Sequence, residues 1–175
     1  MPELMSKNAR AGAGLTTLLL ASTLSTIATD AFAGCVASGS GAVDRLTCGT
    51  GFVLEKAPGS ELTLVPRPGD APPRTLELLD GAILIEVEPG TRPTQIRTPN
   101  AIAAVRGTTY VVEVTAAQTS VFVIDGEVSV RRVSDAARTV RLRAGQGVDV
   151  SDSRFTDALR WPDRRVRALL SRFGR

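Results

Sequence analysis

The sequence predicts an all-β protein, an antiparallel β-roll or sandwich of short strands joined by hairpin turns. The first observation is the alternation of apolar and polar side chains in short runs such as residues 61–65, which is the period of a half-buried strand. The second is that glycine-containing turn sequences separate these runs. The third is the β-branched run 108–115, the strongest strand prediction in the chain. A short C-terminal α-helix and an N-terminal signal helix are the expected departures from this class.

Residues 1–33 have the pattern of an export signal. Lys7 and Arg10 form a positive region, residues 15–27 are largely apolar, and residues 31–33 form a small-x-small cleavage site before Gly34. We therefore predict a signal peptide over 1–33, with a retained anchor helix as the alternative. After this segment no run approaches the ~20 apolar residues of a membrane helix.

Two cysteines, Cys35 and Cys48, lie just after the predicted cleavage site. An exported chain reaches an oxidising compartment, which favours a Cys35–Cys48 disulfide in a periplasmic or secreted protein. The alternative is a lipoprotein anchored at Cys35, because residues 32–35 loosely resemble a lipobox. Two cysteines without any histidine do not complete a four-ligand zinc site, and we predict neither a metal nor another cofactor.

The chain divides into four predicted regions. The signal peptide is followed by an N-terminal β extension over 34–75, which holds the cysteine pair, strand candidates at 51–55 and 61–65, and a Pro-rich loop at 66–73. A β domain is expected over 76–151 and a basic helical tail over 152–175. In that tail, Pro162 precedes an amphipathic helix at 163–173, and Trp161 is expected to anchor this helix to the β body.

Three segments of the β domain look alike, over residues 76–87, 120–130 and 140–150. Each places a glycine turn between two alternating runs, at Asp80-Gly81, Asp125-Gly126 and Gly145. Glycine accepts a positive φ and aspartate tolerates it, so these pairs predict turns between antiparallel strands. Because the spacing is irregular, we interpret the pattern as a pseudo-repeat and not as a solenoid.

Between the first two of these segments lies the most informative part of the chain, residues 96–110. It holds the Thr98-Pro99 turn, a run of small residues, and then Arg106-Gly107-Thr108 at the start of the β-branched run. Together with the three glycine turns, this order resembles the signature of the FecR domain family over residues 76–150. The resemblance implies a periplasmic β domain that, in sensors of this family, receives a signal from an outer-membrane receptor and relays it to an extracytoplasmic-function sigma factor.

Arg106 is the one long charged side chain within the signature. Two roles are open for it: it satisfies a buried carboxylate or carbonyl group in the fold, or it contacts a partner. On the signal-peptide interpretation, we expect the chain to depart from the sensors of the family by lacking the cytoplasmic N-terminal region that would hold a sigma factor. A stand-alone exported member is the more consistent interpretation.

The charge of +3 is unevenly distributed along the chain. Residues 34–130 contain 7 Lys/Arg against 11 Asp/Glu, and residues 131–175 contain 12 Arg against 5 Asp. The tail arginines Arg164, Arg165, Arg167 and Arg172 therefore form a possible basic surface. In an exported protein nucleic acid is not expected, and a solvated arginine-rich end, an anionic glycan or a membrane surface contacted by the helix stay open.

No histidine occurs anywhere in the chain, which removes the commonest general base and metal ligand. No phosphate-cradling loop with a lysine is present either. We therefore predict a protein that is not an enzyme. The first hypothesis is a periplasmic protein-binding or signal-relay module whose partner is an envelope or outer-membrane protein. The others are a structural envelope protein that binds anionic glycan or lipid, and a membrane-anchored reduced sensor that regulates a sigma factor. The sequence does not determine the oligomeric state.

Overall fold

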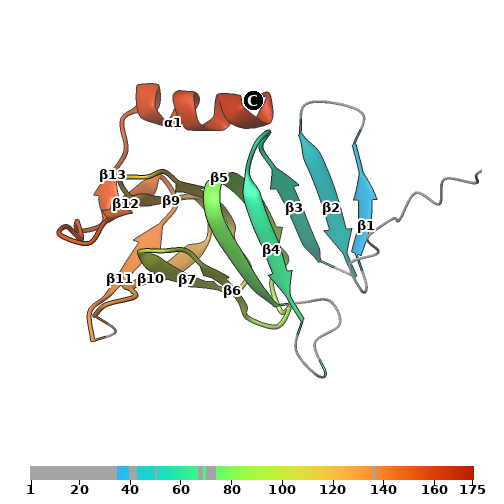
Figure 1. Cartoon of the computed structure of the whole chain (residues 1–175), viewed down its shortest axis with the longest axis horizontal. Coiled ribbons are helices and arrows are strands. Elements are labelled where there is room, and N and C mark those ends of the chain that lie inside the picture. The colour runs from blue at the N-terminus through green and yellow to red at the C-terminus, as the bar shows by residue number, and fades with distance from the viewer. Residues whose placement is uncertain (1–34, 40–42, 50, 67–68, 70–73, 136) are drawn as a thin grey trace, which may run out of the picture.

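The computed structural model describes residues 35–39, 43–49, 51–66, 69, 74–135 and 137–175, so the predicted signal peptide and most of the Pro-rich loop lie outside the described residues. Thirteen strands form one curled mixed sheet, and a short helix follows them (Figure 1). This confirms the predicted all-β class with a C-terminal helix. The strands are β1 Cys35–Ser38, β2 Asp44–Cys48, β3 Phe52–Lys56, β4 Glu61–Val65, β5 Thr75–Val87, β6 Thr94–Arg97, β7 Ala101–Val105, β8 Thr109–Val114, β9 Thr119–Asp125, β10 Glu127–Arg132, β11 Thr139–Arg143, β12 Gln146–Val150 and β13 Leu159–Arg160.

The sheet folds over onto itself around the long strand β5. The second part of β5 belongs to half A, in which the strand order is β1-β2-β3-β5-β8-β9-β12-β13. The first part belongs to half B, in which the order is β4-β5-β6-β7-β10-β11. All neighbouring strands are antiparallel except β5 and β6, which are parallel. After β5 ends at Val87 in half A, the chain returns to half B. There β6 lies beside the beginning of β5 and runs in the same direction.

The glycine turns are corners between the two halves, and the prediction that they close hairpins is wrong. Asp80 and Gly81 lie inside the continuous strand β5, and the strands on either side of Gly126 and Gly145 do not pair with each other. At Gly81 the φ angle is 91°, and a Cβ atom there would lie 2.3 Å from the Ser60 Oγ atom. Glycine alone tolerates the positive φ angle and leaves room for Ser60, because it has no Cβ atom. The strand therefore bends at this residue and passes from half B to half A.

The inner core lies between the two halves. Along β5, Ile83 and Ile85 point into it, whereas Ala82 and Leu84 point to the outer face of half A. This alternation follows from the two-residue period of a strand. Full burial of one such aliphatic side chain contributes about 1.5–3 kcal/mol, which makes this core the main stabilising element.

A helical layer covers the outer face of half A. The helix α1 Asp163–Leu170 and the turn η1 Ser171–Phe173 lie across the strands of this half (Figure 1). Leu169 and Phe173 are buried there together with Leu84. Trp161 stacks on Phe122 of β9, with 5.2 Å between the ring centroids. The prediction that Trp161 anchors the helix to the β body is therefore confirmed.

The predicted disulfide is present between Cys35 and Cys48. The two cysteines face each other directly in the β1–β2 pair, so the bond attaches the edge strand β1 to its neighbour. Over the described ranges, no helix has the length and apolar character that a membrane crossing requires.

Candidate functional site

The Thr98-Pro99 part of the signature is a tight turn between β6 and β7. Thr98 is buried, and its hydroxyl group donates a hydrogen bond to the Ala101 carbonyl oxygen and accepts one from the Ala101 N–H, both at 2.9 Å. The Thr119 hydroxyl group of β9 donates a further bond to Thr98 Oγ1 at 2.8 Å. Thr98 therefore fixes the turn and connects half B to half A.

The Arg106-Gly107-Thr108 part of the signature is a corner between β7 and β8. Gly107 has a φ angle of 66°, and a Cβ atom there would lie 2.9 Å from Pro89 Cα. The buried Thr108 hydroxyl group donates to the Glu127 carbonyl oxygen at 2.9 Å, which joins this corner to the one at Gly126. The close packing at Gly107 and the Thr108 hydrogen bond therefore hold two corners of the sheet against each other.

Arg106 differs from its neighbours because its side chain is exposed. In the part of the chain that the structure describes, its guanidinium group has neither a hydrogen-bond acceptor nor an ion-pair partner. Of the two roles left open by the sequence, a buried partner within the fold is not found. The role in contacting another molecule stays a prediction.

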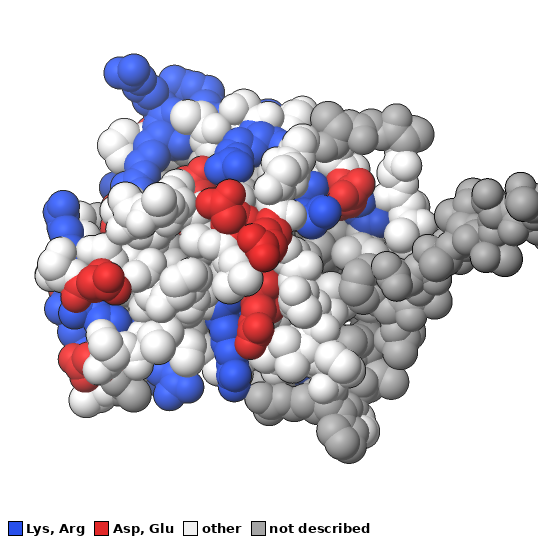
Figure 2. Space-filling model, viewed as in Figure 1, with Lys and Arg blue, Asp and Glu red and all other residues white. Residues whose placement is uncertain are grey.

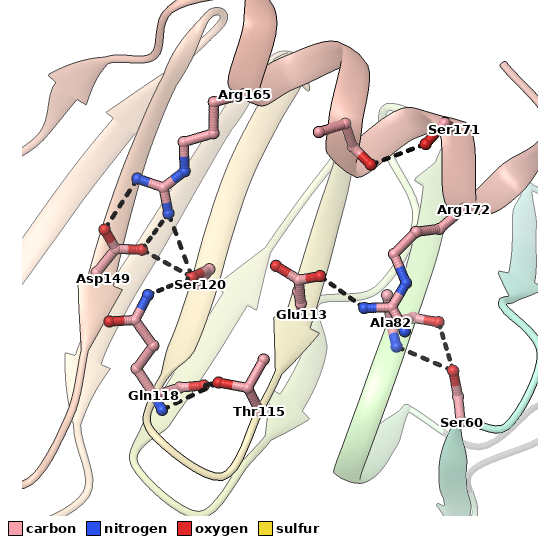
Figure 3. Close-up of polar contacts among 11 residues, drawn as sticks. Ser60, Ala82, Glu113, Thr115, Gln118, Ser120, Asp149, Arg165, Ser171 and Arg172 are labelled. Carbon is pink, nitrogen blue, oxygen red and sulfur yellow. Dashed lines mark hydrogen bonds and ion pairs between the residues drawn. The ribbon is translucent and has the colours of Figure 1, made fainter.

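The basic tail forms ion pairs with acidic residues on the outer face of half A. We call residues Trp161–Arg175 the C-terminal clasp. Arg165 binds Asp149 of β12, with Nη1 3.0 Å from Oδ2, and Arg172 Nη1 lies 2.6 Å from Glu113 Oε1 of β8 (Figure 3). At the end of the chain, Arg175 Nη2 lies 2.8 Å from Glu55 Oε1 of β3. Three arginines of the clasp therefore meet carboxylates on three different strands.

The Arg165 contact is the most elaborate of the three. Its guanidinium group lies over the Trp161 ring, with 3.4 Å from Cζ to the centroid. The Ser120 hydroxyl group donates to Asp149 Oδ1 at 2.7 Å (Figure 3). Partial burial raises the pKa of the Asp149 carboxyl group, but the hydrogen bonds from Arg165 and Ser120 and the charges of Arg165 and Arg154 outweigh it, and the pKa lies below its ordinary value.

Two of the four predicted basic-surface residues do not take part in the clasp contacts. Arg164 and Arg167 are exposed on the solvent side of α1, whereas Arg165 and Arg172 turn to the sheet. Figure 2 shows Lys and Arg side chains gathered at the end of the molecule where α1 begins. The apolar stripe of the helix faces the sheet, so a surface contact by α1 would use its arginines and not its apolar side chains.

Sequence reasoning missed the acidic side of the clasp. Glu55, Glu113 and Asp149 lie far apart in the chain, and no local motif connects them. The available signal was the charge asymmetry between residues 34–130 and 131–175, which we assigned to an external partner or to solvent. In the structure, part of the positive charge of residues 131–175 is neutralised by carboxylates of the same molecule.

The described residues contain no group of three or more His, Cys, Asp or Glu side chains placed to hold a metal ion. Of the predicted site residues, the structure brings together Gly107, Thr108 and Gly126 at adjoining corners. Gly81 and Gly145 lie at other corners of the roll, and Cys35 and Cys48 lie at its edge.

Comparisons with known proteins agree with this architecture. The family described as FecR protein matches residues 36–129, a range that begins within the segment assigned above to the N-terminal extension. Two crystal structures of a proposed anti-sigma factor from Parabacteroides distasonis share the fold, each with a TM-score of 0.60 and 18% sequence identity over 78% of this chain. The chain spans 64% and 63% of the length of those two structures. No curated protein matches the chain.

Proposed function

Because the chain belongs to the FecR family, we propose that it is a non-enzymatic, exported regulatory protein that binds a protein partner in the cell envelope and relays a signal. The anti-sigma factor assignment of its structural neighbours supports a place in signal transduction. The Cys35–Cys48 disulfide indicates an oxidising, extracytoplasmic compartment, which favours a periplasmic or secreted protein. In this state the Cys35 sulfur is not free for acylation, which argues against a lipoprotein anchored at Cys35.

The observation that carries this proposal is that part of the basic charge of the tail is neutralised within the molecule. Arg165, Arg172 and Arg175 bind carboxylates of the sheet, so they do not form a free cationic surface. A structural envelope protein that holds anionic glycan or lipid would need such a surface. Arg164 and Arg167 stay exposed and keep this alternative open to test.

The salt dependence of binding separates the two functions. The exported chain is immobilised and exposed to envelope extract at low and at high ionic strength, and the bound material is identified by mass spectrometry. We expect one periplasmic or outer-membrane protein to be retained at high salt. Recovery of glycan or lipid alone, with loss at high salt, would instead support the structural role, since exposed charges are screened.

Arg106 gives a second test, because its exposed guanidinium group has no partner among the described residues. We expect Arg106→Ala to leave the free energy of unfolding within about 0.5 kcal/mol of the parent chain and to weaken binding of the recovered partner. Arg131→Ala, at another exposed position, is the control and should change neither quantity. A large loss of thermal stability in Arg106→Ala would show that the residue supports the fold.

A further inference from the structure

The two halves of the roll differ in length on one side of β5. Half A continues from β5 through β3, β2 and β1, whereas half B continues with β4 alone (Figure 1). Neighbouring strands lie about 4.8 Å apart, so β1 is about 14 Å from β5 and β4 only about 5 Å. On this side half B ends at β4. Among the described strands, none therefore lies beyond β4 to face the inner sides of β1 and β2.

A groove lies in this place. It has a volume of about 270 Å³ and opens between the edge of β4 and the inner faces of β1 and β2. Its apolar lining includes Ala37 and Leu46 on one wall and Leu62 and Leu64 on the other. Three charged side chains also line it: Lys56 Nζ lies 3.1 Å from Asp44 Oδ2, and Arg45 Nη1 lies 2.6 Å from Glu55 Oε1, so each of them has an ion-pair partner within the chain.

The edge of β4 is an unprotected strand edge that borders the groove. β4 pairs only with β5, so every second residue directs its backbone N–H and C=O groups away from the sheet. Of the other edge strands, β11 carries Arg141 and Arg143, and β13 is only two residues long. β1 is uncharged as well, but it borders the groove with its inner face and not with its edge. Residues 62–65 of β4 carry no charge, and charge is the usual protection against strand addition.

We propose that this groove is the docking site for an extended segment of a protein partner, which adds to the free edge of β4 as a further strand of half B. Such a strand would lie opposite β2, and its alternate apolar side chains would cover Leu46 and Ala37. Backbone hydrogen bonds to β4 would supply affinity, and the groove would select the side chains. The inference rests on the proposed protein-binding function and names the surface that performs it.

The segment of this chain that follows β4 is a poor occupant on sequence grounds. Residues 66–73 contain four prolines, which have no backbone N–H and do not form a ladder with an edge strand. The apolar walls of the groove, and the positions beyond β4 that no described strand of half B fills, both fit an extended, largely apolar segment from outside.

The test uses the full exported chain and a phage-displayed library of random peptides about twelve residues long, enough to extend across an edge strand. Enriched peptides are synthesised and titrated, and amide hydrogen exchange is followed residue by residue. We expect alternating apolar sequences that slow the exchange of β4 amides about tenfold or more. Ala37→Arg, which fills the groove from the opposite wall, should weaken binding at least about tenfold.

Val36→Arg is the matched control. Val36 is the adjacent residue of the same strand, it is 70% exposed and does not line the groove, so this variant should bind like the parent chain. The inference is overturned if no peptide is enriched, if protection appears away from β4, or if Ala37→Arg binds normally. Concentration-dependent dimerisation that protects β4 without peptide would assign the edge to a second copy and also overturn it.

The outcome is separable from that of the proposed function. If an envelope protein is recovered at high salt and binds Ala37→Arg as well as the parent chain, the protein-binding function stands and this docking site is wrong. If no envelope protein is recovered but library peptides protect β4, the docking site stands and the proposed protein-binding function is not supported.

Discussion

Tyr110 places a hydroxyl group inside the inner core. The residue is fully buried, and its oxygen has no hydrogen-bond partner among the described residues. Burial raises the pKa of this phenol well above its ordinary value, so the side chain stays neutral. A buried hydroxyl group without a partner costs about 1–3 kcal/mol relative to one in water, whereas the ring itself contributes apolar area.

We therefore expect Tyr110→Phe to leave the free energy of unfolding unchanged or to raise it by about 1 kcal/mol, measured by chemical denaturation. Thr98→Val is the contrasting variant, because the Thr98 hydroxyl group makes three hydrogen bonds, and it should cost about 1–3 kcal/mol. A loss above about 1 kcal/mol in Tyr110→Phe would mean that a buried water molecule satisfies the phenol.

Gly147 is required by the anchor of the clasp. A Cβ atom on this residue of β12 would lie 2.3 Å from Trp161 Cε2, a separation that side chains do not adopt. We expect Gly147→Ala to destabilise the protein by about 1–3 kcal/mol, because the indole must move off the sheet. Trp161 is the only tryptophan of the chain, so a red shift of its fluorescence reports the displacement directly.

Ser129→Ala is the control for this substitution. Ser129 lies on β10 in half B, and no side-chain hydrogen bond involves it among the described residues. Its variant should keep the Trp161 emission of the parent chain and its stability within about 0.5 kcal/mol. Unchanged emission in Gly147→Ala would show that Trp161 does not pack against β12 in solution.

At the scale of the element, the clasp compensates for a helix that is too short to be stable alone. α1 has eight residues, and isolated helices shorter than about 12–15 residues are marginal in water. Its stability therefore depends on the sheet, through Leu169, Phe173 and the arginine contacts. These contacts make the helix sensitive to the protonation of its carboxylate partners.

The clasp is expected to weaken in acid. The pKa of Asp149 is lower in the folded protein than in the unfolded chain, so its contribution to stability is fully present above the unfolded value of about 3.9 and is lost as the pH falls through the folded value. We expect the Trp161 emission to shift to the red below about pH 4, before the β-sheet signal in circular dichroism is lost.

Asp149→Asn is the variant that tests this assignment, because it removes the titrating group and keeps the shape. Its Trp161 emission should lose the acid transition assigned to this residue. Arg164→Ala changes an exposed arginine of the same helix and should preserve the transition of the parent chain. An identical acid transition in Asp149→Asn would show that Asp149 does not cause it.

The strands themselves were predictable, but several of their partners were not. Residues 61–65 and 108–115 alternate or are β-branched, and β4 and β8 form there. Asp80-Gly81 and Asp125-Gly126 instead form corners, because the same positive φ angle serves a hairpin and a bend between sheet halves. Which of the two forms depends on the strands available on each side, and a local sequence does not contain that information.

At the scale of the whole molecule, the charge asymmetry shows why the site was harder to predict than the fold. The excess of arginine after residue 131 is plain in the sequence, but its carboxylate partners come from β3, β8 and β12. These strands are brought to one face only by the order of the sheet. Predicting the clasp therefore required the strand pairing as well as the composition.

The disulfide acts on the edge that borders the proposed docking groove. Closing a loop with a sequence separation of 13 stabilises a folded chain by about 3 kcal/mol in the chain-entropy model. β1 buries little of its surface, so we expect the disulfide to matter most for holding this strand in place. We expect reduction by dithiothreitol to accelerate hydrogen exchange in β1 and β2 while β8 and β9 stay protected.

Because β1 forms one wall of the groove, its release should also weaken binding of peptides at the β4 edge, by an amount comparable to the effect of Ala37→Arg. The variant in which Cys35 and Cys48 are both replaced by serine should reproduce the reduced state and be insensitive to dithiothreitol. Global loss of protection on reduction would show that the disulfide supports the whole roll, and unchanged exchange in β1 would show that strand pairing alone holds this edge.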